Sequence, residues 1–493
     1  MFNKMYLEQL EKMKKINKYI TATILTVVSG GAATAQTMKP TPKLVVNITI
    51  DQLRTDYIEA FSPYYGDDGF KKLFKEGVVY HHAQCTYAPV DRASSMASAM
   101  TGTAPSNHGI TGRQWLDKES LVPVDCTYDR NYEGIFTNER VSPKNLATST
   151  INDELKMATD GKALVYSFAF DCDMAVMGGG HAADGVFWFN RENGTWCSSK
   201  YYYKKPPKWI ETYNILNVND FNTFNANTNV TNVALLCINS TEMGMDGVTD
   251  MLNVSYIAQP AKRKGITDKE ELQNTYIQLD RELEKLTTKL ESKFGKDNVL
   301  FVVMGTGCFD EDMADYAKYR IPSGTFFINR TASLLNMYLS AIYGQDKYVE
   351  AYFYNQIFLN FKDIEMKRLN MTEILERSQA FLIQNAGVKN AFTRKDLLFM
   401  GRNGDQRLRN WYNATTCGDL VVEVIPGWRL FNEDNKQQYL SRENVFPFPI
   451  IFYGAGQQAQ EVIIPVTTDR IAPTIAKAIR IRAPNACASS PLF

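Results

Sequence analysis

Histidine is scarce in this sequence, and neither sign of charge is in excess. Only four histidines occur among the 493 residues, and none follows His181. Zinc sites are built from imidazole, thiolate and carboxylate ligands, so the chain beyond His181 can supply no imidazole to one. Lysine plus arginine and aspartate plus glutamate each number 54. The lack of a basic surplus argues against nucleic acid as a partner.

Long apolar runs are also missing, except for a short one near the N-terminus. Residues 1–35 have the parts of a signal peptide: a basic segment that begins at Met13, an apolar stretch at 19–28 and a small-residue cleavage site that ends at Ala35. We interpret Met13 as the true start. No later run reaches the ~18 apolar residues of a transmembrane helix. The pattern predicts an exported protein, in the periplasm or associated with the outer membrane or cell surface of a Gram-negative bacterium, with no transmembrane segment after signal cleavage.

Cysteine pairs with the C-x-x-C spacing are absent, which excludes a zinc ribbon and a thioredoxin-like redox motif. An even number of cysteines in an exported chain permits up to four disulfides, and buried thiols are the alternative. The eight are Cys85, Cys126, Cys172, Cys197, Cys237, Cys308, Cys417 and Cys487.

Buried strands and amphipathic helices are both predicted. The run 44–50 is mostly apolar and β-branched and the run 299–304 is apolar throughout, as in the strands of a parallel sheet covered on both faces. A capping box at Thr267 starts a long amphipathic helix, which Gly295 ends. Further elements are predicted at 70–76, 421–425 and 449–453. This alternation predicts an α/β fold with a doubly wound, mostly parallel sheet.

One large domain is predicted over 41–493, with inserted segments at about 120–235 and about 333–420. Asp51 directly follows the first strand. Ligands of open α/β sheets bind at the carboxyl ends of the strands, so Asp51 is the first candidate site residue.

Four stretches of the sequence, in order, resemble the alkaline phosphatase superfamily. They are 43–57 (KLVVNITIDQLRTDY), 100–110 (MTGTAPSNHGI), 279–283 (LDREL) and 469–474 (DRIAPT). They are similar to the phosphate-irrepressible alkaline phosphatases, with nucleotide pyrophosphatases as relatives, over about residues 41 to 490. The resemblance implies an alkaline phosphatase-like fold and a two-zinc centre that hydrolyses phosphate esters with a Thr or Ser nucleophile.

At several positions the chain departs from the family's site. Asp51 matches the first metal-binding carboxylate, but Arg92 stands at the place of the nucleophile. Arg113 stands where the family has a phosphate-binding Asn. Asp171 and Asp173 stand where it has a phosphate-binding Lys and Arg, so two cations are replaced by two anions.

The remaining metal positions have also changed. Gly305 and Thr306 replace an Asp-His pair, and no residue matches the other expected ligands. Asp51 is thus the only retained residue of ligand type. We predict from these losses that zinc is absent, that no other cofactor is bound and that no catalytic residue is intact. Ser94 and Ser95 are hydroxyls close to the expected nucleophile.

These features predict a pseudoenzyme: an exported, catalytically inactive alkaline phosphatase-like protein that acts as a binding or scaffold component of the cell envelope. Its predicted partner is an envelope protein or an outer-membrane complex. One alternative is a metal-dependent hydrolase of phosphate or sulfate esters with a rearranged site around Asp51, Ser94 or Ser95. A second alternative is a small-ligand binding protein whose pocket prefers cations, because of Asp171 and Asp173.

Arginine in place of a metal ion also suggests how Asp51 is neutralised. We hypothesise an ion pair between Asp51 and Arg92, with Arg113 facing Asp171 or Asp173. An acidic cluster and a run of three tyrosines each have two interpretations. The acidic residues at 310–315 suit Ca²⁺ or, more simply, a solvated loop, and the tyrosines at 201–203 suit either a carbohydrate or protein contact or aromatic packing.

Overall fold

The computed structural model describes residues 40–217, 225–259, 267–308, 320, 322–399, 406–425, 427–439 and 446–493. The predicted signal peptide at 1–35 lies outside the described residues. The acidic residues at 310–315 lie outside them too. Among the helices that the structure describes, none is long and apolar enough to cross a membrane.

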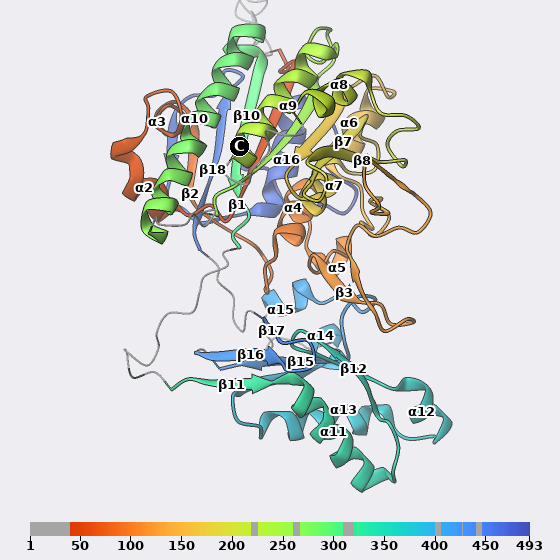
Figure 1. Ribbon diagram of the computed structural model, residues 1–493. Coiled ribbons are helices and arrows are strands. Elements are labelled where there is room, and N and C mark those ends of the chain that lie inside the picture. The colour runs from red at the N-terminus through yellow and green to blue at the C-terminus, as the bar shows by residue number, and fades with distance from the viewer. Residues whose placement is uncertain are drawn as a thin grey trace, which may run out of the picture. The chain divides into compact units, whose positions relative to one another are not determined.

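An eleven-stranded sheet forms the centre of the fold (Figure 1). Its five middle strands are parallel: β10 (Val299–Gly305), β1 (Leu44–Asp51), β9 (Asp250–Ile257), β6 (Val165–Ala169) and β7 (Gly185–Asn190). The flanking strands are β18 (Phe448–Gly454), β2 (Val78–Gln84), β19 (Gln460–Val462), β20 (Val466–Thr467), β8 (Thr195–Ser199) and β5 (Gly134–Ile135). Strand β18 is antiparallel to both of its neighbours. The predicted fold class, a mostly parallel α/β sheet, is confirmed.

Helices cover both faces of this sheet, as β1 shows by its alternating contacts. Val45 belongs to the core on one face, and Val46 and Ile48 belong to the core on the other. The first face is covered by α4 (Arg92–Thr101), α5 (Pro105–His108), α6 (Ile151–Ala158), α7 (Cys172–Gly179) and α16 (Ile471–Ile479). The second is covered by α2 (Thr55–Phe61), α3 (Phe70–Glu76), α8 (Lys208–Asn217), α9 (Ala226–Ser240) and α10 (Asp268–Phe294). Single turns of 3₁₀ helix lie at Ser62–Tyr64, Lys296–Asn298 and Thr468–Arg470.

Residues 324–439 build two smaller sheets around a core of their own. One consists of β11 (Gly324–Phe327), β16 (Trp428–Asn432) and β17 (Gln437–Tyr439), and the other of β12 (Val349–Phe353), β13 (Gln356–Leu359), β15 (Leu420–Val424) and β14 (Val388–Thr393). Their helices are α11 (Ile328–Tyr343), α12 (Phe361–Met366), α13 (Met371–Ile383), α14 (Arg394–Phe399) and α15 (Gln406–Trp411). The Trp411 indole donates a hydrogen bond to the Thr111 carbonyl, at 2.7 Å. A hairpin of β3 (Gln114–Leu116) and β4 (Pro123–Asp125) also contacts this region, because Leu116 packs against Phe353 and Phe358.

Helix α10 confirms the helix predicted from the capping box. The Thr267 hydroxyl accepts a hydrogen bond from the Glu270 amide, and the Glu270 carboxylate accepts one from the Thr267 amide. Gly295 ends the helix with φ at 85°, a left-handed value that favours glycine. Leucines four residues apart, such as Leu279 and Leu283, are fully buried against the sheet.

Asp280, from one of the stretches that resemble the family, anchors the start of α3. Its buried carboxylate accepts hydrogen bonds from the amides of Gly66 and Phe70, at 2.9 and 2.7 Å. We expect Asp280→Ala to lower the free energy of unfolding by about 2 kcal/mol, because the buried amide of Phe70 and the partly buried amide of Gly66 lose their acceptor. Urea unfolding followed by tryptophan fluorescence would measure the change. Replacement of its exposed neighbour in Arg281→Ala is the control, and a loss no larger than the control's would contradict the expectation.

All eight cysteines are free thiols in the structure, and five of them are buried. The predicted disulfides are therefore not supported, and the alternative of thiols holds. A buried cysteine packs as a small apolar side chain, which accounts for these positions without a cross-link.

Candidate active site

The site is built around Asp51, at the carboxyl end of β1. The carboxylate is 4% exposed and accepts a hydrogen bond from the Thr306 hydroxyl, at 2.8 Å. Thr306 follows β10, which is the neighbour of β1 in the sheet. Burial raises the pKa of Asp51 to about 7, and the nearby Arg92 opposes that rise. Asp51 therefore gains a proton near neutral pH.

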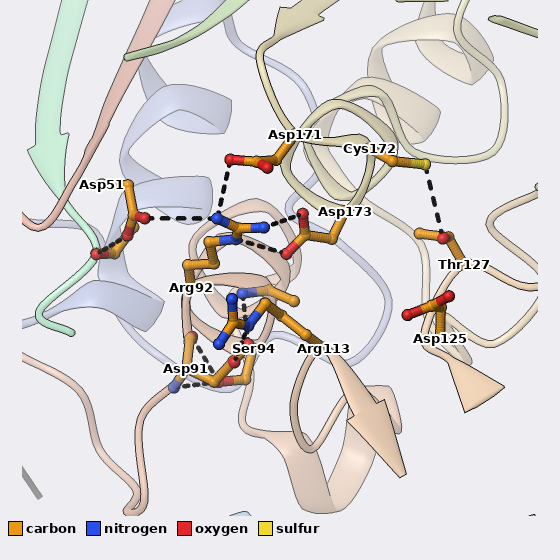
Figure 2. A network of polar contacts seen from close by, with 12 residues as sticks. Asp51, Asp91, Arg92, Ser94, Arg113, Asp125, Thr127, Asp171, Cys172 and Asp173 are labelled. Atoms are coloured by element: carbon orange, nitrogen blue, oxygen red, sulfur yellow. Dashed lines mark hydrogen bonds and ion pairs between the residues drawn. The ribbon is translucent and has the colours of Figure 1, made fainter. Parts of the chain in front are cut away.

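Arg92 is the first residue of α4, and its guanidinium contacts three carboxylates (Figure 2). Its Nε and Nη2 atoms donate to the two oxygens of Asp173, at 2.8 and 3.0 Å. Its Nη1 atom donates to Asp171 at 2.8 Å and lies 3.9 Å from Asp51. The predicted ion pair between Asp51 and Arg92 is confirmed. The three carboxylates raise the pKa of Arg92 despite its burial, so the side chain stays charged.

The acidic partners of Arg92 come from the turn between β6 and α7. Asp171 precedes α7 and Asp173 lies in its first turn. Asp171 also accepts a hydrogen bond from Arg191, at 2.8 Å, and Arg191 follows β7. Burial raises the pKa of Asp171, and Arg92 and Arg191 oppose the rise. Strands β10, β1, β9, β6 and β7 are consecutive in the sheet, which is why these residues meet at one edge.

We call Asp51, Arg92, Asp171, Asp173 and Arg191 the Arg92 cluster. Three carboxylates face two guanidinium groups, so the fully ionised cluster carries one net negative charge. A like-charge excess in a site of low dielectric favours protonation of one carboxyl group. This agrees with the raised pKa values of Asp51 and Asp171.

Arg113 lies beside the cluster and forms an ion pair with Asp91, at 3.0 Å. The hypothesis from the sequence placed Arg113 opposite Asp171 or Asp173, whereas this ion pair is with Asp91. Asp91 is the N-cap of α4, where its carboxylate accepts a hydrogen bond from the Ala93 amide. The positive charge of Arg113 is a minor influence that opposes the rise in the pKa of Asp171 caused by burial. The Arg113 side chain is 44% exposed.

The two serines near the expected nucleophile position are fully buried. Ser94 completes the capping box of α4 and accepts a hydrogen bond from the Tyr87 hydroxyl, at 3.1 Å. Ser95 lies 3.9 Å from the sulfur of Cys85. Neither serine lines the cavity described below, so the rearranged site proposed around them from the sequence receives no support from their positions.

At Gly305 the structure shows why an acidic ligand is missing. A Cβ atom there would lie 2.8 Å from the Cβ of Phe448, and the same ring crowds Gly307. The aromatic ring of Phe448 therefore occupies the space that a side chain at 305 would need. Thr306, between the two glycines, supplies the hydrogen bond to Asp51.

A cavity of about 820 Å³ opens beside the cluster and is lined in part by Arg92, Arg113, Asp171 and Asp173. Further lining residues come from segments that the sequence analysis treated as insertions. They include Asp125, Tyr128, Asn138, Glu139, Arg140, Trp188, Asn190, Glu192 and Tyr354, and Gln114 of β3 lines the cavity as well. This volume falls within the range of small-molecule sites in proteins.

All four histidines are described, and none contacts Asp51. His81 and His82 lie on β2, His108 is bonded to Ser98 in the core, and His181 is bonded to Asp153. Among the described residues no three His, Cys, Asp or Glu side chains are grouped as a metal site would require. Asp51 is the only family-type ligand within the described part of the chain, which therefore does not fit a two-zinc centre.

His181 and the tyrosines at 201–203 form a local structural network. The Nδ1 and Nε2 atoms of His181 each lie 2.9 Å from an acceptor, the Asp153 carboxylate and the Leu146 carbonyl. Tyr201 and Tyr202 donate to the carbonyls of His181 and Gly180. The interpretation of these tyrosines as packing residues is therefore the one that the structure supports.

Stability should depend on pH through His181. Burial lowers the pKa of His181, but the Asp153 carboxylate outweighs this effect and the net pKa is raised. The raised pKa stabilises the fold below the unfolded value of about 6.5, and this contribution is lost as pH rises through the folded value. We expect His181→Gln to be less stable than wild type at pH 5.5, by a difference that shrinks at pH 8.5. Thermal unfolding at both pH values would measure it, and an equal difference at the two would contradict this.

Two residues of the site escaped the sequence analysis. Arg191 lies in a polar turn without a motif, and only the proximity of β6 and β7 brings it to Asp171. Asp91 could have been found, because aspartate directly before a helix is a common N-cap.

A mostly parallel α/β sheet with its charged site at the carboxyl ends of the middle strands is the architecture of the alkaline phosphatase-like hydrolases. Comparison with known proteins places the chain among them. The sequence model of the Type I phosphodiesterase / nucleotide pyrophosphatase family matches residues 45–446. The chain belongs to this family.

Similar proteins extend over nearly the whole chain. Alkaline phosphatase PafA of Elizabethkingia meningoseptica is 25% identical, with 94% of this chain and 97% of the relative covered. Alkaline phosphatase PhoV of Synechococcus elongatus is also 25% identical, with 90% and 91% covered. The crystal structure of wild-type PafA has a TM-score of 0.80 at 24% identity, with 92% and 98% covered, which supports the fold.

These findings correct the functional predictions made from the sequence. The chain belongs to a hydrolase family, and relatives of matching length are named as alkaline phosphatases, so the prediction of an inactive pseudoenzyme that acts as a scaffold is wrong. The prediction that zinc and other cofactors are absent is wrong as well, because the family and the relatives named as alkaline phosphatases point to a metal cofactor, although the described residues group no ligands for a two-zinc centre. That prediction inferred the loss of chemistry from the loss of individual family residues.

Proposed function

We propose that this protein is an enzyme that hydrolyses phosphate esters in the cavity beside the Arg92 cluster. Family membership over residues 45–446 is the observation that carries the proposal. The relatives named as alkaline phosphatases support it, because their alignments cover 94% and 90% of this chain. The active site is rearranged relative to the family pattern, with Arg92 in place of the nucleophile.

The site contains arginines that can bind a phosphoryl group and aspartates that compete with it. Hydrolysis of a phosphate ester depends on positioning and on stabilising the charge of the transferred group. Arg92 stands at the N-terminus of α4, where the helix dipole adds to its positive charge, and Arg113 lines the same cavity. Asp171 and Asp173 compete for Arg92, so a bound phosphate has to replace at least one of these contacts.

The described side chains limit which group can attack the phosphorus atom. Ser94 and Ser95 are fully buried and do not line the cavity. Water in the cavity is the nucleophile that these positions favour. Asp51 does not line the cavity, but it lies 3.9 Å from Arg92, which does, and with a pKa of about 7 it is a group that can hold a proton at neutral pH behind that side chain.

The purified protein should hydrolyse a chromogenic phosphate monoester or diester at a rate that depends on protein concentration. Turnover of neither ester at any pH between 6 and 10 would contradict the proposal. A sulfate ester assayed in parallel tests the other ester class that the sequence analysis considered.

Removal of metal ions tests the cofactor. We expect dialysis against a chelator to lower the hydrolysis rate at least about tenfold, because each bound metal stabilises the transition state by several kcal/mol. Addition of a divalent metal ion should restore the rate. Elemental analysis before and after dialysis gives the metal content per chain. Full activity at negligible metal content would contradict a metal requirement.

We also propose that the protein is exported, which the signal-like sequence at 1–35 supports. Its placement in the periplasm or at the outer membrane, and an envelope partner, stay predictions from the sequence. Fractionation of cells that carry the full-length gene, with and without residues 1–35, would test export.

A further inference from the structure

The cavity beside the Arg92 cluster is larger than a phosphate group needs. Its volume is about 820 Å³, and Arg92, Asp171 and Asp173 lie in one part of its lining. A ligand site of this size holds a whole small molecule. The remaining wall should therefore select the organic group that is esterified to the phosphate.

Several aromatic rings in this wall have no free face for a planar ligand. The Phe170 ring stacks on Phe189, with centroids 5.6 Å apart and planes at 9°, and the Arg191 guanidinium lies 4.5 Å from its centroid. Trp188 is 2% exposed and donates its indole hydrogen to Glu139. A flat heteroaromatic group that stacked on the outer face of Phe170 would have to displace the Arg191 guanidinium, which also donates to Asp171.

Exposed polar side chains form much of the rest of the wall. The exposed charged residues are balanced, since three arginines stand with three acids. They are Arg113, Arg140, Arg191, Asp125, Glu139 and Glu192. Amide side chains add further donors and acceptors, and Tyr128 is 43% exposed. A balanced wall of donors and acceptors fits a neutral group with many hydroxyls.

We propose that the group esterified to the phosphate is a carbohydrate, so that the substrate of this site is a sugar phosphate. The inference rests on the proposed hydrolase function and adds the class of substrate to it. Selectivity comes from hydrogen bonds: a site built to bond hydroxyl groups rejects ligands that leave its polar side chains unpaired.

The first experiment compares kcat/KM for three phosphate monoesters: glucose 6-phosphate, adenosine 5′-monophosphate and an aryl phosphate. We expect the value for glucose 6-phosphate to exceed that for the nucleotide at least about tenfold. Equal values, or a preference for the nucleotide, would overturn the sugar inference while leaving the hydrolase function intact.

A substitution in the cavity lining tests whether that lining determines the preference for a sugar phosphate. Asp125 lines the cavity and accepts one hydrogen bond from Gln114, at 2.8 Å. We expect Asp125→Ala to lower kcat/KM for glucose 6-phosphate about tenfold more than for the aryl phosphate, because only the sugar offers hydroxyls to the carboxylate. Asp67→Ala is the matched control, since the Asp67 side chain is 97% exposed and does not line the cavity. An unchanged ratio of the two substrates in Asp125→Ala would count against the inference.

Binding separates this inference from the proposed function. Calorimetric titration with glucose 6-phosphate, glucose and inorganic phosphate needs no turnover. Tighter binding of glucose 6-phosphate than of inorganic phosphate, weakened in Asp125→Ala, would support the sugar site even if no ester were hydrolysed. Equal binding of glucose 6-phosphate and inorganic phosphate would overturn it even if the aryl phosphate were hydrolysed.

Discussion

Replacing Arg92 with alanine is expected to lower the free energy of unfolding by about 3 to 5 kcal/mol and to reduce hydrolysis at least about a thousandfold. The guanidinium donates to Asp171 and Asp173 and lies 3.9 Å from Asp51. Without it three partly or fully buried carboxylates face one another with Arg191 as the remaining cation of the cluster. The substitution also removes the positive charge that stands at the place of the family's nucleophile.

Urea unfolding and turnover of an aryl phosphate measure the two effects of Arg92→Ala. Arg330→Ala is a matched control, because Arg330 pairs with Glu433 at the exposed surface, where solvent screens the pair and leaves it little effect on stability. Arg92→Lys keeps the charge but not the paired hydrogen bonds, and it should recover part of the stability. If Arg92→Ala unfolded no more easily than the surface control, the cluster would not have the role described here.

Replacing Asp51 with asparagine is expected to reduce hydrolysis about a thousandfold and yet to stabilise the fold at pH 8. Burial raises the folded pKa of Asp51 to about 7, above the ordinary value of 3.8. A raised pKa means that the stability this group contributes is fully present below pH 3.8 and is lost as pH rises through 7. The loss amounts to roughly a few kcal/mol at about 1.4 kcal/mol per pKa unit.

Asparagine avoids that loss, because it stays neutral and can still accept the hydrogen bond from Thr306. The stability difference between Asp51→Asn and wild type should therefore favour the variant at pH 8 and disappear near pH 4. Denaturant unfolding at both pH values would show it. Asp56→Asn is a control with the opposite sign, because the hydrogen bond from Arg54 lowers the pKa of Asp56. A pH-independent difference for Asp51→Asn would contradict the raised pKa.

The two substitutions distinguish the parts of the site. Both should remove activity, but Arg92→Ala should destabilise the protein whereas Asp51→Asn should stabilise it at alkaline pH. A variant that lost activity only because it unfolded would not show this opposition. The comparison therefore separates chemistry from folding at one cluster.

Much of the fold was predictable because its signals are local. The apolar run at 44–50 and the capping box at Thr267 became β1 and α10 with boundaries within one residue. Asp51 could be placed at the ligand-binding side of the sheet because it stands at the carboxyl end of a predicted parallel strand. The charge reversal at Asp171 and Asp173 could be read from alignment with the family's motifs, and so could the pairing of Arg92 with Asp51.

The prediction of an inactive protein was wrong because it rested on the loss of individual site residues and not on the similarity of the whole chain to a hydrolase family. Loss of the expected ligands at individual positions suggested an inactive protein, but similarity over residues 45–446 assigns the chain to a family of hydrolases. Positions compared one at a time do not show which groups a rearranged site uses instead. Ser94 illustrates this: it is near the nucleophile position in sequence, yet the capping box of α4 buries its hydroxyl.

The sequence by itself determined the parallel α/β sheet, the position of Asp51 and the small number of imidazole ligands, because strand periodicity, strand ends and composition are properties of short segments. Only the tertiary structure decided that Arg191 completes the cluster, that Arg113 pairs with Asp91 and that Phe448 fills the space beside Gly305. These contacts join residues from separate strands and loops. Their distances depend on the order of strands in the sheet, which no local pattern in the chain encodes.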